Sequence, residues 1–188
     1  MIPTSQIPGR VFLDTCVVNF ILDYGEQIHD GAEAPEGIRD LDADDINALQ
    51  KICVLGQRAA WQLAISPHTY FEITRTGNEE RRSALDPWFQ ELRQYWRSTV
   101  HSNDDLPTFI EAEDERVQAL GSGYLEVLPD VSDRVLLCDA LVYRCDLFCT
   151  RDVSTIIKHR AELSGLPLEI VSPAEWWKKI EPFASLWA

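Results

Sequence analysis

Short apolar runs alternate along the chain with longer stretches in which apolar positions recur every three or four residues. The runs 10–13, 62–66, 146–150 and 168–171 are mostly apolar and are followed by polar or turn-forming residues. Runs of this length predict strands that are buried on both faces, and the stretches between them predict helices. Strands that alternate with helices are typical of a parallel sheet covered on both faces. We therefore predict an α/β fold, a three-layer sandwich with a mainly parallel central sheet.

Prolines, glycines and capping residues predict where the helices begin and end. Proline favours the first helical position, and Ser or Asp just before a helix caps it. Asp44 or Asp45 is the predicted cap of the second helix, and Ser132 or Asp133 is the predicted cap of the helix that ends near Arg144. The predicted helices cover 16–22, 45–61, a stretch that starts at Pro67 after Ser66, 79–98 with a break at Asp86-Pro87, 107–120, 133–144, 153–163, and a terminal stretch from Pro173.

Acidic residues are concentrated in one segment. The chain has 31 acidic and 17 basic residues, a formal net charge of −14, and the segment 23–45 holds nine of the acids against one base, Arg39. This segment also contains glycines and a proline and has little apolar periodicity, so we predict an acidic insertion that forms a loop or lid. The charge argues against wide contact with a nucleic-acid backbone but leaves room for a local site. A length of 188 residues fits one domain, 1–188.

Several protein classes are disfavoured by the sequence. No apolar run approaches the roughly 20 residues that span a bilayer, and the first ten residues show no apolar signal core, so we expect a cytoplasmic protein with no membrane partner. The five cysteines form no C-x-x-C pair and the four histidines form no H-x-x-x-H pair. A zinc hydrolase and a thioredoxin-type redox protein therefore have little support, and buried free thiols are the preferred interpretation of the cysteines.

Four carboxylates lie at or near the ends of the predicted elements. Asp14 follows the first strand, Asp152 comes just after the third, Glu72 is on the helix that leaves the second, and Asp139 is in the helix that precedes the third. Ligands of parallel sheets collect beyond the carboxyl ends of the strands, which directs the first three of these acids to one edge. For a single acid a helix cap or a surface ion pair is the commoner role. Together the four predict hard oxygen ligands for a divalent cation.

The segments around these acids resemble the successive acidic motifs of the PIN domain. They are VFLDT at 11–15, SPHTYFE at 66–72, DAL at 139–141 and LFCTRD at 147–152, and IVSPAE at 170–175 resembles the last strand and helix of that family. The resemblance covers nearly the whole chain in order, apart from the acidic insertion and a long helical middle, 79–131. Thr-Arg-Asp after an apolar strand is the most specific single motif.

PIN domains are typically metal-dependent ribonucleases, and many are toxins of toxin–antitoxin pairs. The resemblance implies that Asp14, Glu72, Asp139 and Asp152 are catalytic and bind Mg²⁺ or Mn²⁺. It implies an endoribonuclease that hydrolyses a phosphodiester bond of RNA, more readily single-stranded RNA, with a metal-activated water. An antitoxin or another protein partner is also implied.

Residues beside the motifs are expected to support the acids and the substrate. We expect Thr15 and Thr150 to orient the aspartates by hydrogen bonds. Arg75, three residues after Glu72 and hence on the same helical face, is expected to contact phosphate, as is Arg151. Arg81 and Arg82 are more distant candidates.

Two alternatives to a ribonuclease remain open at this stage. The first is a PIN-like domain without useful activity that binds a protein or nucleic-acid partner, which the net charge of −14 favours. The second is an aspartyl-phosphate enzyme with Asp14 as nucleophile, which ranks last because Cys16 stands where a dehalogenase-like phosphatase needs a second aspartate.

Two further groups of residues allow more than one interpretation. Asp133 lies six residues before Asp139, about 120° away around a helix, so we interpret it as an N-cap rather than a fifth acid of the site. For the six tryptophans we prefer core packing to base stacking. The alternative for Trp176, Trp177 and Trp187 near the C-terminus is an oligomer surface, such as that of a homodimer.

Overall fold

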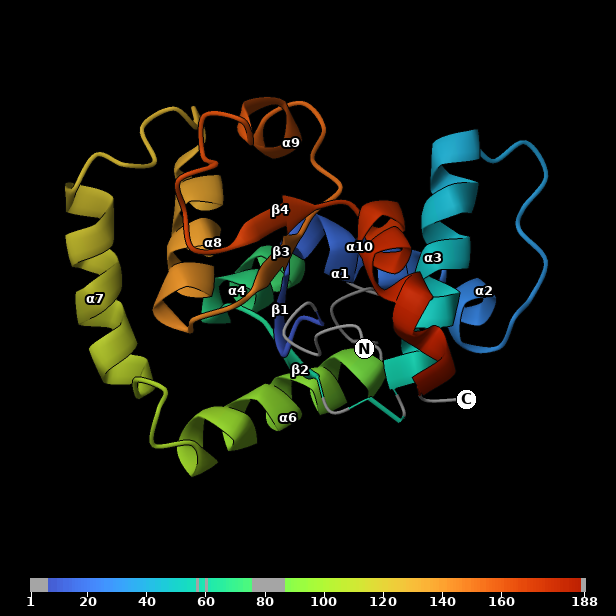
Figure 1. Ribbon diagram of the computed structural model, residues 1–188, viewed down its shortest axis with the longest axis horizontal. Helices are drawn as coiled ribbons and strands as arrows, with labels where there is room; N and C mark the ends of the chain where they lie inside the picture. Colours follow the sequence, from blue (N-terminus) through green and yellow to red (C-terminus); the bar gives the residue numbers. More distant parts are fainter. Residues whose placement is uncertain (1–6, 57, 60, 76–86, 187–188) are drawn as a thin grey trace.

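Four parallel strands form one sheet at the centre of the molecule (Figure 1). The computed structural model describes residues 7–56, 58, 59, 61–75 and 87–186. In this structure the strands lie in the order β2-β1-β3-β4. Their bounds are β1 Arg10–Leu13, β2 Gln62–Ala64, β3 Leu147–Cys149 and β4 Glu169–Val171. The predicted α/β class and the parallel sheet are confirmed.

The two central strands are almost completely buried, which explains their continuous apolar runs. Phe12 of β1 pairs in register with Phe148 of β3, and their rings stack with centroids 5.3 Å apart. Both side chains are fully buried. This contact fixes β1 beside β3, although 133 residues separate the two strands in sequence.

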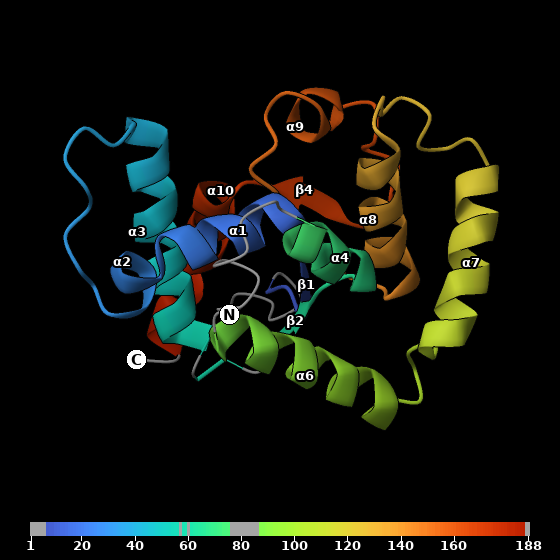
Figure 2. The ribbon, with the colours of Figure 1, turned by 180° about the vertical axis from the view of Figure 1, so that it is seen from behind.

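Helices lie on both sides of the sheet. Figures 1 and 2 show α3 beside α10 on one side and α7 beside α8 on the other, while α6 runs past β2. The helices are α1 Thr15–Asp23, α2 Gly25–His29, α3 Asp40–Gly56, α4 Pro67–Arg75, α6 Pro87–Ser102, α7 Phe109–Gly121, α8 Val131–Val142, α9 Ile156–His159 and α10 Pro173–Ile180, followed by a 3₁₀ helix, Glu181–Leu186. Within the described residues, no helix is long and apolar enough to cross a membrane.

Local capping sets several helix starts as predicted. Ser66 Oγ accepts a hydrogen bond from the backbone N–H of His68 in the first turn of α4. Ser172 and Glu175 form a reciprocal capping box at the start of α10. The predicted break at Asp86-Pro87 agrees with the start of α6 at Pro87, whereas the part of the predicted helix before it lies outside the described residues.

The acidic segment differs from the prediction of a continuous loop. It contains α2, and α3 begins at Asp40, so Asp44 and Asp45 lie inside the helix and do not cap it. Acidic side chains in a first helical turn interact favourably with the helix dipole, and this offsets the weak apolar periodicity. The residues 30–39 between these helices are irregular and mostly exposed, so only this part keeps the predicted loop character.

Helix bounds in the second half of the chain also differ. The cap of α8 is Asp130, whose carboxylate accepts from the backbone N–H of Ser132, so the prediction of Ser132 or Asp133 was wrong. The helix ends at Val142, and Arg144 after it adopts a positive φ of 53°. The predicted helix 153–163 is reduced to α9.

The strand order places a topological switch point between β1 and β3. From β1 the chain crosses to β2 on one side and later returns to β3 on the other, so the connections diverge at the carboxyl ends of β1 and β3. Ligands of doubly wound sheets bind at such a point. Asp14 directly follows β1 there, and its backbone N–H donates to the carbonyl of Cys149 at the end of β3, at 3.0 Å.

Candidate functional site

Asp14 is a buried carboxylate held by hydroxyl and thiol groups. Its side chain is 4% exposed, and Oδ2 accepts hydrogen bonds from Thr150 Oγ1 at 2.5 Å and from Cys16 Sγ at 2.9 Å. Thr150 Oγ1 in turn accepts from the backbone N–H of Asp152 at 2.9 Å. The Thr150 hydroxyl therefore connects the loop that carries Asp152 to Asp14, the contact expected from the sequence.

Burial dominates the electrostatics of Asp14. Desolvation raises the pKa of its carboxyl above the ordinary value, although the hydrogen bonds from Cys16 and Thr150 oppose this, and the nearby charge of Asp152 adds to it. The pKa of the Cys16 thiol is raised well above its usual value, first by burial and then by Asp14. Cys16 is thus a neutral donor to Asp14 and not a nucleophilic thiolate.

Asp152 and Asp133 lie side by side at the same sheet edge. Thr155 Oγ1 contacts Asp133 Oδ2 at 2.9 Å and is also hydrogen-bonded to Asp152 Oδ2. Asp152 Oδ1 accepts from the N–H and hydroxyl of Ser154 and from the N–H of Thr155. Partial burial acts to raise the pKa of Asp152, but these hydrogen bonds outweigh it and lower the pKa.

The pKa of Asp133 is shifted in the opposite direction to that of Asp152. Desolvation raises its pKa to about 6, and the charges of Asp14, Asp152 and Asp130 add to this effect, while Thr155 opposes it. The Thr155 hydroxyl has one proton and can donate to only one of its two carboxylate neighbours at a time. Asp133 and Asp152 thus share one donor, and three carboxylates, with Asp14, repel one another across the switch point.

Glu72 is connected to this group through Thr15. Thr15, the residue after Asp14, donates its hydroxyl to Glu72 Oε2 at 2.5 Å. Glu72 Oε1 also lies 3.4 Å from His68 Nε2, one turn earlier on α4. Thr15 therefore contacts Glu72, whereas the sequence led us to expect that it would orient an aspartate.

Asp139 is engaged in a separate buried contact. Its side chain is 1% exposed, accepts a hydrogen bond from Ser66 Oγ, and has Oδ1 3.1 Å from Arg116 Nε. The two atoms are in ion-pair contact without the alignment of a hydrogen bond. Burial raises the pKa of Asp139, and Ser66 and Arg116 oppose the shift. Arg116 thus places a positive charge beside the buried carboxylate of Asp139.

The direction of α8 explains why Asp133 and not Asp139 lies near Asp14. A crossover helix runs antiparallel to the strands it connects, so the N-terminus of α8 lies at the carboxyl edge of the sheet. Asp133 is in its first turn. Asp139 is six residues further on, about 9 Å along the helix axis toward the opposite edge. Asp133 is thus a first-turn residue beside the carboxyl edge, and the N-cap is Asp130.

The two predicted phosphate contacts differ in their surroundings. The side chain of Arg151 is held by other residues of the protein. Its guanidinium contacts the carboxylates of Asp42 and Asp45 on α3 and lies 3.5 Å over the ring of Phe20. Arg75 is exposed at the end of α4. The candidates Arg81 and Arg82 lie outside the described residues.

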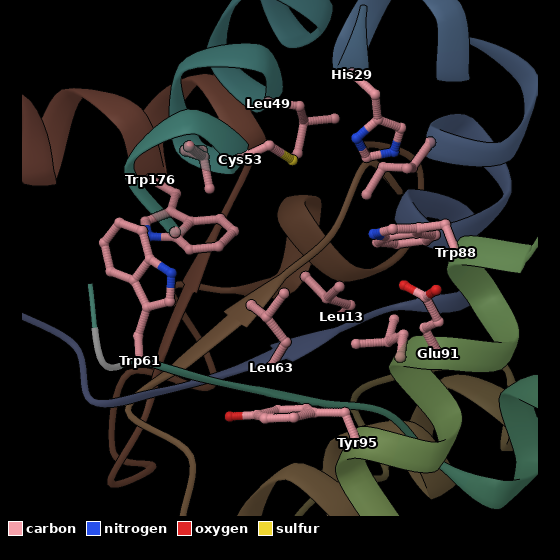
Figure 3. A pocket seen from close by; sticks show the side chains of 14 residues that line it. Leu13, His29, Leu49, Cys53, Trp61, Leu63, Trp88, Glu91, Tyr95 and Trp176 are labelled. Atoms are coloured by element: carbon pink, nitrogen blue, oxygen red, sulfur yellow. The ribbon is translucent and has the colours of Figure 1, made fainter. Parts of the chain in front are cut away.

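An aromatic cavity of about 460 Å³ lies between α3 and α6 (Figure 3). Trp61 and Trp176 meet edge to face on one side of it, and His29 and Trp88 lie on the other. Trp61 and Trp176 are buried, as expected for core packing. Of the described residues that line the cavity, Glu91 is the only acid, so this cavity is separate from the candidate site.

As positioned, the described His, Cys, Asp and Glu side chains form no group of three that could hold a metal ion directly. Comparisons of the chain with family models, curated proteins and solved structures found no match.

Proposed function

We propose that the protein is a divalent-metal-dependent endoribonuclease with a PIN-like fold. The observation that carries the proposal is the convergence of Asp14, Asp133 and Asp152 at the switch point. In the described part of the chain none of these three acids forms an ion pair with Arg, Lys or His. Asp14 is buried and the other two are half-buried, and such acids that repel one another without a cation are typical of a site that receives one.

The chemistry of these ligands fits Mg²⁺ or Mn²⁺. Both ions prefer carboxylate oxygens, and Mg²⁺ keeps several of its waters and takes only one or two carboxylates directly. Direct contact with three side chains is therefore not required. When bound, such an ion lowers the pKa of a coordinated water and polarises the phosphate. Asp14, Asp133 and Asp152 would hold it.

Neighbouring residues keep these ligands in place. Thr150 holds Asp14 and the backbone of Asp152 through the same hydroxyl. Thr15 connects the segment after β1 to Glu72, so Glu72 would support the ligands through this hydrogen bond. In this proposal Asp139 supports the fold through Ser66 and Arg116 and is not a ligand.

The test is cleavage of single-stranded RNA by the purified protein with Mn²⁺ and with EDTA. We expect cleavage only with the metal, and its loss in Asp14→Asn and Asp152→Asn. Asp114→Asn, a change at an exposed aspartate of α7, is the matched control and should cleave like the wild type. Cleavage that persists in EDTA or in Asp14→Asn would contradict the proposal. Tight Mn²⁺ binding without cleavage of any RNA would instead indicate a binding module.

A further inference from the structure

One face of α6 carries a row of basic and uncharged polar side chains. They lie three or four residues apart and line a hollow of about 480 Å³; they are Gln90, Arg93, Gln94, Arg97, Ser98 and His101. Glu91 faces away from this row, into the cavity of Figure 3. Among the described residues, neither Arg93 nor Arg97 forms an ion pair with a carboxylate. In a chain of net charge −14, this is a local positive surface.

Aromatic side chains continue this surface. A second hollow of about 420 Å³ shares Arg93 and Arg97 with the first and is also lined by Tyr70, Phe71 and Phe109. Phe71 is 58% exposed, although apolar side chains of this size are usually covered. The guanidinium of Arg93 lies 4.2 Å over the ring of Tyr70, which keeps that arginine in the groove. The two hollows form one groove, which we call the α4–α6 groove.

The α4–α6 groove and the candidate site share helix α4. Ser66 and Pro67, which follow β2 at the carboxyl edge of the sheet, line its aromatic part. Phe71 precedes Glu72 on α4, and Glu72 is hydrogen-bonded to Thr15 next to Asp14. Helix α4 therefore carries both Glu72, which contacts the segment after β1, and Phe71, which lines the groove.

We propose that the α4–α6 groove binds single-stranded RNA on one side of the cleavage position. This inference rests on the proposed function and names the path of its substrate. Exposed aromatic rings stack on unpaired bases, which a duplex keeps stacked inside. Phe71 takes a base, and Arg93 and Arg97 contact the phosphates that follow. The negative net charge of the protein repels RNA as a whole, but the arginines of the groove offer a local positive surface along which RNA can bind.

The test is binding of a fluorescently labelled single-stranded RNA oligonucleotide in EDTA, measured by fluorescence anisotropy, so that no cleavage is needed. Phe71→Ala should weaken binding about tenfold, the value of one base–aromatic stack. The double variant Arg93→Gln/Arg97→Gln should weaken it and reduce the slope of log K against log salt by about 1.4, or about 0.7 per phosphate contact. A change in folding alone would not move that slope.

Matched controls separate the groove from general charge. Lys158→Gln/Lys178→Gln removes two positive charges at exposed positions of α9 and α10, and Tyr124→Ala removes an aromatic ring that is 63% exposed. Both should bind RNA like the wild type. Equal losses in the groove and control variants, equal affinity for a blunt duplex of the same sequence, or preference for an acidic peptide over RNA would overturn the inference.

The outcomes for the groove and for the proposed function are distinguishable. If the wild type binds RNA through the groove but cleaves none with Mn²⁺, the proposed function fails and the groove stands. If the wild type cleaves RNA and Phe71→Ala keeps both its affinity and its KM, the groove fails and the proposed function stands.

Discussion

The repulsion around Asp133 predicts that removing its charge stabilises the protein. Its pKa is raised from 3.8 to about 6 by burial and by the neighbouring acids. A shift of about 2 units is equivalent to about 3 kcal/mol at about 1.4 kcal/mol per unit. Because Asp133 is only partly buried, solvent screening reduces this to about 1–2 kcal/mol. Asp133→Asn should raise the free energy of unfolding near neutral pH by that amount in EDTA.

The pH dependence gives the sign of the effect. The folded protein binds the Asp133 proton more tightly than the unfolded chain, so the contribution of this group is fully favourable below about pH 3.8. It is lost as the pH rises through about 6, the folded-state value. The gain from Asp133→Asn should therefore be absent near pH 4 and fully present above about pH 6.

Urea unfolding followed by tryptophan fluorescence measures the gain in the free energy of unfolding and its dependence on pH. Asp114→Asn is the control for loss of an exposed acid. Excess Mn²⁺ should stabilise the wild type, by about 2.7 kcal/mol at a hundred times its Kd, and should stabilise Asp133→Asn much less. A variant that is destabilised at neutral pH, or equally affected at both pH values, would refute this account of Asp133.

Three further changes test other parts of the structure. Arg151→Met should lower the free energy of unfolding by about 3–4 kcal/mol because Asp45, 2% exposed, loses its charged partner. Arg39→Met removes an exposed arginine and should lower it much less, so equal losses in urea unfolding would contradict the buried contact. Thr150→Val should lower the free energy of unfolding by about 1–3 kcal/mol and slow RNA cleavage, because it leaves Asp14 and the N–H of Asp152 without their shared hydrogen-bond partner. Unchanged stability and cleavage rate would show that the Thr150 hydroxyl does not hold these two groups. Asp139→Asn should change stability but leave the Mn²⁺ affinity within about twofold of the wild type, because Asp139 is paired with Arg116 in this proposal. Calorimetric titration with Mn²⁺ measures that affinity.

The apolar runs were sufficient to predict the sheet. β1 and β3 are buried on both faces, so their sequences carry an unbroken signal, and Asp14 at the end of β1 follows from it. The helices between them were less predictable at their ends. Asp45 lies buried inside α3 opposite Arg151, more than a hundred residues away, and no local pattern contains that information, whereas Asp42 also pairs with Arg39 three residues before it.

The candidate site was predictable to the extent that topology determines it. Asp14 and Asp152 follow strands, and the strand order brings them together. Asp133 was missed because its role depends on which end of α8 meets the carboxyl edge, a question of helix direction rather than of the angle around the helix. A helix that precedes a strand of a parallel sheet starts at that edge, and this rule would have favoured Asp133 over Asp139.

The pairing of Asp139 with Arg116 had no comparable signal. Arg116 lies on α7, in the helical middle that the resemblance does not cover, and the contact forms because α7 packs on α8. The contacts of Arg151 had no local signal either. Its position beside Asp152 in sequence says nothing about the acids of α3 that its guanidinium contacts.

Electron paramagnetic resonance, in which bound Mn²⁺ loses the signal of the free ion, can test directly whether Asp14, Asp133 and Asp152 form a metal site. We expect that the wild type binds Mn²⁺, that Asp14→Asn and Asp133→Asn each weaken binding by at least about tenfold, and that Asp139→Asn does not. If Asp139→Asn weakened binding as much as Asp14→Asn while Asp133→Asn left it unchanged, or if the wild type bound no Mn²⁺, the site would not be the one described.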